Sequence, residues 1–361
     1  MMLTHAFYLD LCLQCAWKEQ LKTLPNPAVA ALVLDKNGMI LSLESHKECG
    51  KPHAEVLALQ KAYAALSGNN AILSLKDSEA IHSYLLKNAI PTFKDITLYV
   101  TLEPCSSNKK GKTPSCAALL KALKPKCVVI GAQDCNESAK GGAQELLDSG
   151  IIVLKAWEVE SLQECHQKAK ALLLPFRALQ TQGKFMLFKY ASRLDGSIDG
   201  GQISTKGAQS LMHDYRTKAD VLLISGESVR ADNPRLDTRF ATLAQRNPNV
   251  AILTHQKDFP KTAPLFTIPN RKVEILHSLE QVESLRGFIF CEGGARFFNA
   301  LQNFIDLVLV ILNPSLKKDS NLRMSLDASF HLLHSAQIAE DIFLWLAKNK
   351  FIFWDITKRA K

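Results

Sequence analysis

Strand-like apolar runs alternate with segments of helical spacing along residues 1–157, and this alternation restricts the first part of the chain to an α/β fold. Runs 28–35 and 39–45 flank a Lys-Asn-Gly tripeptide, which predicts a β-hairpin. Later strands are expected at 96–103, 127–134 and 151–156, and helices at 52–66, 116–124 and 142–150. An extra helix is expected within 66–94. We therefore predict a layered α/β domain over residues 1–157.

The second half of the chain shows a similar alternation after a charged helical segment at 158–183, which we predict to be a linker region. Residues 184–361 then form a second α/β domain. Its strands are expected at 184–191, 220–226, 250–254, 272–277, 288–294, 305–312 and 351–357, and its helices at 205–219 and 294–303. Several strands run into loops with Gly, Asp or Ser, which is typical of open sheets that bind ligands at the strand ends.

Composition is that of an ordinary globular chain, with 47% hydrophobic and 22% charged residues. The first 22 residues resemble an amphipathic helix rather than a signal peptide, and no apolar run is long enough to span a bilayer. We expect a cytoplasmic protein that does not bind membranes. The nine cysteines are then mostly thiols, and any cluster of them is more typical of metal binding or catalysis than of disulfides.

The formal charge of +9 is compatible with nucleic acid or with a phosphorylated small molecule. The distribution of arginine favours the second, because the first arginine is Arg177. Nucleic-acid surfaces depend on arginine for bidentate and stacking contacts. We therefore predict a phosphate-bearing small molecule as the partner and no nucleic acid.

A histidine and two cysteines have the sequence context of a zinc site. His53 and Glu55 open a helical pattern, Cys105 follows a proline at the end of a strand run, and Cys116 begins the next helical pattern. A zinc ion that activates water needs three N or S ligands and one open position. We predict one zinc per chain, held by His53, Cys105 and Cys116, with Glu55 moving protons without ligating the metal. The order H-x-E followed by P-C and a second cysteine is that of zinc base deaminases.

Two other interpretations of this cluster stay open at this point. A structural zinc site would need a fourth protein ligand, for which Cys49, Cys127 and Cys135 are available. A nucleic-acid deaminase is supported only by the net charge, because the C-x-x-C spacing and nearby stacking aromatics are missing.

The segments PHAEV (52–56) and TLEPCS…GKTPSC (101–116) resemble the deaminase half of the bifunctional deaminase/reductase family of riboflavin biosynthesis. Members of this family also space the two cysteines widely, although the loop here is longer and 66–94 is an insertion. The resemblance implies a cytidine-deaminase-like α/β/α layer sandwich. It also implies substrate contacts at four positions, namely Asn26 of a P-N-P turn, His46, and Asp134 and Asn136 of a D-x-N loop.

Three stretches of the second half also fit this family. They are FKYASRLDGSIDG (188–200), ISGESVRADNPRLDTR (224–239) and CEGGARFFNAL (291–301). The last is a strand, two glycines and a helix, which can hold a pyrophosphate but lacks the G-x-G-x-x-G of a Rossmann fold. In this order the stretches are similar to the family's reductase half, which resembles dihydrofolate reductase and uses NADPH.

The resemblance assigns roles within this reductase-like domain. It implies cofactor contacts at Lys189, Ser204, Ser228, Asp232, Gly293, Gly294 and Ala295. It implies substrate contacts at Arg216, Arg235, Arg239 and Glu292, and paired arginines suit a phosphate group. One departure is a shortened loop, in which only GQIST (201–205) remains of a longer family segment.

The implied function is a two-step one. The chain would deaminate 2,5-diamino-6-(5-phosphoribosylamino)pyrimidin-4-one by means of zinc-activated water and then reduce the ribosyl side chain to ribityl with NADPH. We expect a homo-oligomer. The alternative is a deaminase only, with a degenerate, non-catalytic reductase-like domain.

Overall fold

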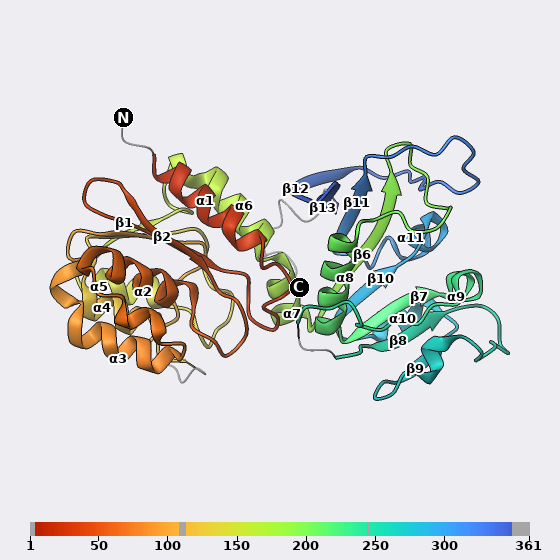
Figure 1. The fold of residues 1–361 in the computed structure, drawn as a ribbon, viewed down its shortest axis with the longest axis horizontal. Coiled ribbons are helices and arrows are strands. Elements are labelled where there is room, and N and C mark those ends of the chain that lie inside the picture. Colours follow the sequence, from red (N-terminus) through yellow and green to blue (C-terminus); the bar gives the residue numbers. More distant parts are fainter. Residues whose placement is uncertain (1–3, 108–112, 244–245, 349–361) are drawn as a thin grey trace, which may run out of the picture. The chain divides into compact units, whose positions relative to one another are not determined.

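The computed structural model describes residues 4–107, 113–243 and 246–348. Contacts between residues divide the chain into two compact units, Met1–Gln180 and Thr181–Lys361 (Figure 1). No helix in the described ranges is both long enough and apolar enough to cross a bilayer.

A five-stranded sheet forms the centre of the first unit, in the order β2-β1-β3-β4-β5. The strands are β1 (Ala30–Leu34), β2 (Ile40–Ser45), β3 (Thr97–Val100), β4 (Cys127–Ile130) and β5 (Ile152–Lys155). β1 runs antiparallel to β2 and β3, whereas β3, β4 and β5 are parallel to one another. β1, β3 and β4 are almost entirely buried, as expected for central strands covered on both faces.

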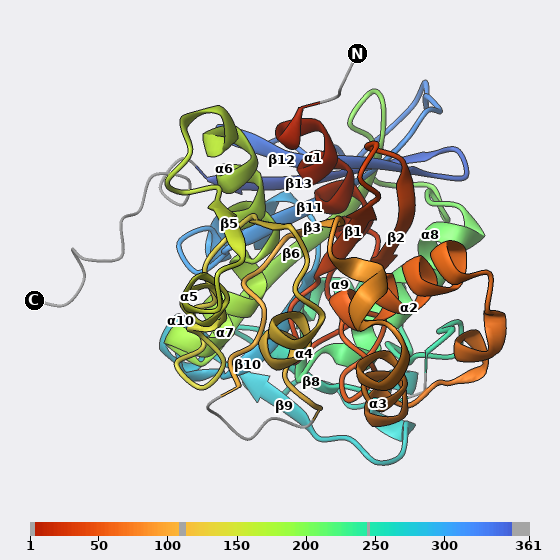
Figure 2. The same ribbon diagram turned by 90° about the vertical axis from the view of Figure 1, so that its left-hand side faces the viewer.

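Helices cover both faces of this sheet. The helices that precede β6 are α1 (His5–Trp17), α2 (Ala54–Ser67), α3 (Ser78–Asn88), α4 (Cys116–Leu123), α5 (Gly142–Asp148), α6 (Gln163–Leu172) and α7 (Leu174–Gln182). α1 and α6 lie together on one face, and α2 to α5 lie on the other (Figures 1 and 2). The predicted α/β/α layer sandwich is thus confirmed.

The segment predicted to be a linker is helical, and its first helix packs on the first unit. Lys168 of α6 forms an ion pair with Asp10 of α1 at 2.8 Å. The side-chain amide of Gln20 donates to the carbonyl of Leu172 at 2.6 Å. Helix α6 therefore belongs to the layer that covers the sheet.

The segment 66–94, which the family resemblance predicts to be an insertion, contains the predicted extra helix, α3. It lies between two short 3-10 segments, Asn70–Ser74 and Ile90–Phe93. Gln60 of α2 anchors the first segment, because its buried amide donates to the carbonyls of Ile72 and Leu75. α3 packs against α2 and α4, at whose N-terminal ends His53 and Cys116 lie.

An eight-stranded sheet forms the second unit, in the order β12-β13-β11-β6-β10-β7-β8-β9. The strands are β6 (Lys184–Arg193), β7 (Val221–Ser225), β8 (Asn249–Leu253), β9 (Val273–Leu276), β10 (Gly287–Glu292), β11 (Leu307–Asn313), β12 (Phe330–Ile338) and β13 (Asp341–Lys348). The six strands from β11 to β9 are parallel, and the β12–β13 hairpin adds an antiparallel edge (Figure 1).

The helices of this unit are α8 (Lys206–Lys218), α9 (Gly226–Asp232), α10 (Leu279–Ser284) and α11 (Ala295–Leu301). Aromatic side chains fill the core around β6 and β10, namely Phe185, Phe188, Phe288, Phe290 and Phe298. The sequence patterns identified α8, α11 and the strands β6 to β11 but missed α9, α10 and the β12–β13 hairpin. The strand predicted at 351–357 lies outside the described residues.

The loop at 201–205, which the family resemblance predicts to be shortened, leads into a helix whose first residues are firmly held. The backbone N–H and the hydroxyl of Thr205 both donate to the carboxylate of Asp341, each at 2.7 Å. Asp341 is buried at the beginning of β13, and Asn313 donates to its second oxygen at 2.7 Å. The loop therefore delivers α8 in a fixed position despite its length.

Candidate active sites

The three predicted zinc ligands meet in the first unit. His53 precedes α2, Cys105 lies in the loop after β3, and Cys116 is the first residue of α4. Nδ1 of His53 lies 3.7 Å from Sγ of Cys105 and 3.4 Å from Sγ of Cys116. Tetrahedral ligands at about 2.0–2.3 Å from a zinc ion stand about 3.3–3.8 Å apart. The donor atoms therefore fit zinc without rearrangement of the chain.

Within the described residues, this trio is the single group of His, Cys, Asp or Glu side chains close enough to share a metal. Cys49, Cys127 and Cys135, the candidates for a fourth ligand, are not part of it. The arrangement matches three protein ligands and an open position, as in catalytic rather than structural zinc sites.

Neighbouring groups fix these ligands in place. Oγ1 of Thr113 lies 3.2 Å from Nε2 of His53, on the opposite side of the imidazole from the sulfur atoms. The backbone N–H of Cys116 donates to the sulfur of Cys105 at 3.3 Å. A hydrogen bond with the Cys116 side chain lowers the pKa of Cys105 to about 4, and His53 adds to this effect against the opposing effect of burial. Cys105 is therefore ready to bind metal as a thiolate.

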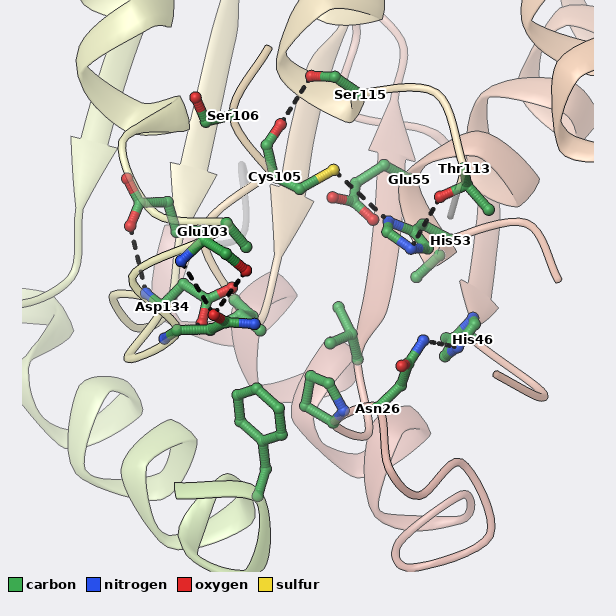
Figure 3. A pocket seen from close by; sticks show the side chains of 18 of the residues that line it. Asn26, His46, His53, Glu55, Glu103, Cys105, Ser106, Thr113, Ser115 and Asp134 are labelled. Carbon is green, nitrogen blue, oxygen red and sulfur yellow. Dashed lines mark hydrogen bonds between the residues drawn. The ribbon is translucent and has the colours of Figure 1, made fainter. Parts of the chain in front are cut away.

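Glu55 lies in the first turn of α2 beside the cluster but is not one of its members (Figure 3). The residue is 4% exposed, and burial raises the pKa of its carboxyl. His53 and Glu55 both line one pocket of about 390 Å³. The carboxyl group is thus available for proton transfer in the pocket rather than for ligation.

The predicted substrate contacts Asn26 and His46 line the same pocket (Figure 3). Burial lowers the pKa of His46 to about 4, so the imidazole is neutral at neutral pH. Its Nδ1 lies 3.0 Å from the carbonyl of Pro52, which requires a proton on Nδ1, and its Nε2 accepts from the amide of Asn26 at 3.1 Å. The amide orientation of Asn26 is thereby fixed, which leaves its oxygen as an acceptor.

Asp134 and Asn136 also line the pocket, and Glu103, which the sequence reasoning missed, holds their loop. The carboxylate of Glu103 accepts from the backbone N–H groups of Asp134, Gly141 and Ala143 at 3.2, 3.1 and 3.0 Å. Its position directly before the Pro-Cys pair was the available sequence signal. Burial raises the pKa of Asp134 to about 6.

Other residues of this site were also missed. Glu145 of α5 holds the beginning of the cysteine loop, because it accepts from the hydroxyl of Ser106 at 2.5 Å and from the N–H of Ser107 at 2.9 Å. Phe176 and Gln180 of α7 line the pocket from the segment predicted to be a linker. Their separation of four residues on a helix was the only local signal.

A second pocket, of about 1040 Å³, lies at the carboxyl ends of β6, β7, β8 and β10 in the second unit. This edge is where open parallel sheets bind ligands. All seven predicted cofactor contacts line it, together with Glu292: Lys189, Ser204, Ser228, Asp232, Gly293, Gly294 and Ala295. Its volume is at the upper end of the range typical of small-molecule and cofactor sites.

Gly293 lies in the tight turn between β10 and α11, beside this pocket. A Cβ atom at this position would lie 2.6 Å from Cδ1 of Phe297, whose ring is buried under the turn. A side chain at residue 293 would therefore displace the turn between β10 and α11 that borders the pocket.

Glu292 joins two cations. Its carboxylate lies 3.3 Å from Nζ of Lys189 and 2.6 Å from Nη2 of Arg216. Burial alone would raise the pKa of Glu292, but Arg216 and Lys189 lower it to about 2. The group is therefore a carboxylate that keeps both cations oriented.

The other two predicted arginines lie on a different carboxylate. Arg235 and Arg239 both form ion pairs with Asp237, which is nearly buried, while their own side chains are about half exposed. None of the three predicted arginines lines the larger pocket among the described residues. The structure thus brings Arg235 and Arg239 together on Asp237, whereas Arg216 pairs with Glu292.

The first unit has three side chains placed to hold a metal and a buried glutamate, and the second unit has a large pocket on a parallel sheet. Together they define a zinc-dependent deaminase joined in one chain to a reductase-type domain. The comparisons with known proteins agree. Residues 2–132 match the cytidine and deoxycytidylate deaminase zinc-binding region, and residues 184–317 match the RibD C-terminal domain.

Curated relatives extend over both units. Riboflavin biosynthesis protein RibD of Haemophilus influenzae is 30% identical over 304 residues, which cover 79% of this chain and 71% of the relative. The protein of the same name from Aquifex aeolicus is 29% identical over 346 residues, 86% of each chain. The chain therefore belongs to the RibD family, the bifunctional deaminase–reductases of riboflavin biosynthesis.

Solved structures show the same fold. A diaminohydroxyphosphoribosylaminopyrimidine deaminase/5-amino-6-(5-phosphoribosylamino)uracil reductase from Thermotoga maritima aligns with a TM-score of 0.62 at 23% identity, over 95% of this chain and 98% of that one. RibD of Acinetobacter baumannii aligns with a TM-score of 0.61 at 23% identity, with the same coverage. The predicted two-domain α/β architecture is thereby confirmed.

Proposed function

We propose that this chain catalyses two consecutive reactions. The first removes the 2-amino group of 2,5-diamino-6-(5-phosphoribosylamino)pyrimidin-4-one, and the second reduces the ribosyl side chain of the product to ribityl with NADPH. The observation that carries the proposal is the close approach of three potential zinc ligands, Nδ1 of His53 and the sulfur atoms of Cys105 and Cys116. The carboxyl group of Glu55 is buried beside them.

In the deaminase site, His53, Cys105 and Cys116 would hold zinc, which supplies an activated water near neutral pH. Glu55 takes one proton from the water and passes it to a ring nitrogen. It then takes the second proton, from the hydroxyl group now on the ring carbon, and gives it to the departing amino group, which leaves as ammonia. The oxygen of Asn26, oriented by His46, accepts a hydrogen bond from the pyrimidine. Asp134 and Asn136, held by Glu103, bind its polar substituents.

In the reductase pocket, NADPH would supply the hydride. Lys189, Ser204, Ser228, Asp232, Gly293, Gly294 and Ala295 are the proposed cofactor contacts, because all of them line the pocket. Glu292 orients the ammonium of Lys189, which can donate a proton to the substrate as the hydride arrives at C1′.

The arginines are the proposed contacts of the substrate phosphate. Arg235 and Arg239 present half-exposed guanidinium groups that Asp237 holds close together. Guanidinium groups bind phosphate in a bidentate manner. Arg216, paired with Glu292, lies between this pair and the pocket, since it also donates to the carbonyl of Asp237 at 3.3 Å.

We further propose that the protein acts in the cytoplasm as a homo-oligomer and binds neither nucleic acid nor membranes. The absence of arginine before Arg177 supports the exclusion of nucleic acid. The alternative of a deaminase with a degenerate reductase half is not favoured, because the second half matches the RibD C-terminal domain over residues 184–317.

The test is a coupled assay on the purified full chain with zinc and NADPH. Ammonia release and NADPH oxidation should proceed in equal amounts from the diaminopyrimidine substrate. Ammonia release with no oxidation of saturating NADPH would instead support the deaminase-only alternative, and oxidation without ammonia would contradict the order of the two steps.

A further inference from the structure

Helix α7 forms one wall of the deaminase pocket. Phe176 and Gln180 are four residues apart, so they lie on one face of this helix, and both line the pocket that holds His53 and Glu55. The helix lies well beyond residues 2–132, which match the deaminase zinc-binding region. The pocket is therefore completed by a segment outside the zinc-binding part of the unit.

Phe176 differs chemically from the other lining residues. The groups contributed by Asn26, Asp134, Asn136 and Glu103 are hydrogen-bonding groups suited to the edge of a heterocycle. Apart from the imidazoles of His46 and His53, which are engaged with Asn26 and the cysteines, Phe176 brings the one aromatic ring among the described lining residues. A pyrimidine has two flat faces that such edge contacts leave uncovered.

The two α7 residues differ in how much of their surface is exposed to solvent. Phe176 is 6% exposed, whereas Gln180 is exposed. Phe176 therefore lies in the inner part of the pocket and Gln180 at its mouth. A substrate whose ring enters toward Glu55 must leave its phosphoribosylamino arm at the mouth, on the side of Gln180.

We propose that Phe176 stacks on the pyrimidine ring of the deaminase substrate and that Gln180 contacts the arm attached to that ring. Helix α7 is thus a specificity-determining part of the deaminase site. This inference rests on the proposed deaminase function. Stacking of a base on an aromatic side chain is worth about 1–3 kcal/mol, which predicts a change in affinity of roughly 5- to 150-fold.

The experiment compares Phe176→Leu, which keeps an apolar side chain but removes the ring, with Phe176→Tyr, which keeps the ring. The matched control is Gln182→Ala, since Gln182 is exposed on the same helix and does not line the pocket. For each full-length, zinc-loaded protein, KM and kcat of ammonia release, zinc content and melting temperature are measured. Binding of 2,5,6-triaminopyrimidin-4-one, the base without its arm, is measured by calorimetry.

Phe176→Leu should raise KM and the dissociation constant of the base about tenfold, with kcat within about threefold of the parent and zinc content unchanged. Phe176→Tyr should restore both values, and Gln180→Ala should raise KM without weakening binding of the armless base. Gln182→Ala should change nothing.

Equal binding of the base by the parent and by Phe176→Leu would overturn the proposal, and so would equal losses in the Leu and Tyr variants, which indicate packing rather than stacking. A parent protein that binds the base but releases no ammonia would contradict the proposed deaminase function alone, because the binding comparison still tests Phe176.

Discussion

Thr113 contacts the imidazole ring of His53 on the side opposite to the two cysteines. Its Oγ1 lies 3.2 Å from Nε2, whereas both cysteine sulfur atoms lie within 3.7 Å of Nδ1. The contact suits the tautomer of His53 that binds metal through Nδ1, because Nε2–H then donates to the threonine hydroxyl. Nδ1 is then left with a lone pair for the metal.

Replacing Thr113 by valine should therefore weaken zinc binding without removing a ligand. Loss of such a supporting hydrogen bond lowers metal affinity about 10- to 100-fold. The dissociation constant, measured by competition with a chromogenic chelator, should rise by this factor. The control is Thr262→Val, an exposed threonine of the second unit. Unchanged zinc affinity in Thr113→Val would show that packing alone orients His53.

Glu55→Gln should abolish deamination while leaving the metal in place. The carboxyl is needed to move protons, and its loss is expected to lower kcat at least about 100-fold. Zinc content should stay near one per chain, because Glu55 is outside the ligand cluster. Ammonia release and elemental analysis measure the two properties, with the exposed Glu48→Gln as a control. Loss of zinc from Glu55→Gln would mean that Glu55 is a ligand.

Gly293→Ala should impair the reductase step selectively. The new methyl group would lie 2.6 Å from the ring of Phe297, so the turn beside the pocket must move. We expect KM for NADPH to rise about tenfold or more, with deamination unchanged. Gly207→Ala is the matched control, because its Cβ would meet the nearest atom at an ordinary 3.4 Å. A normal KM for NADPH in Gly293→Ala would remove this turn from the proposed cofactor site.

Asp306 predicts a pH dependence of stability. Burial raises its pKa to about 6, although the backbone N–H of Met186 donates to its carboxylate at 2.7 Å. The pKa in the unfolded chain is about 3.9, so the folded state favours the protonated form. The resulting stabilisation is complete below pH 4 and is lost as the pH rises through 6.

Asp306→Asn should abolish this dependence, since the amide stays neutral and can still accept from Met186. Relative to the parent, the variant should gain about 2 kcal/mol in free energy of unfolding between pH 4 and pH 8. Denaturant unfolding at both pH values measures the difference, and the exposed Asp327→Asn should show none. A constant difference across this range would contradict the raised pKa.

The zinc trio could be predicted from sequence because each ligand stands in a local motif at the start of a helix or the end of a strand. Glu103 was missed because its partners, the N–H groups of Gly141 and Ala143, come from the beginning of α5, 38 and 40 residues away. Phe176 was missed for a similar reason. Its helix lies within the segment 158–183 that was predicted to be a linker, and only the folded chain brings it to the pocket.

The ion pairs of the second unit also could not be predicted from the sequence. Three arginines were predicted as substrate contacts, but the carboxylate with which each one pairs depends on distances in space. Arg216 pairs with Glu292, whereas Arg235 pairs with Asp237. The β12–β13 hairpin was missed because β12 is a half-exposed edge strand whose register shifts between Leu332 and His334, which breaks the alternation expected of a strand.

The two hydrogen bonds between Thr205 and Asp341 have a consequence for the loop that precedes α8. A loop that positions a helix can be shortened without harm only when another part of the chain takes over the anchoring. Here that part is a single carboxylate 136 residues further on. Loss of Asp341 would therefore release the start of α8, so one residue of β13 holds in place a helix that begins far earlier in the chain.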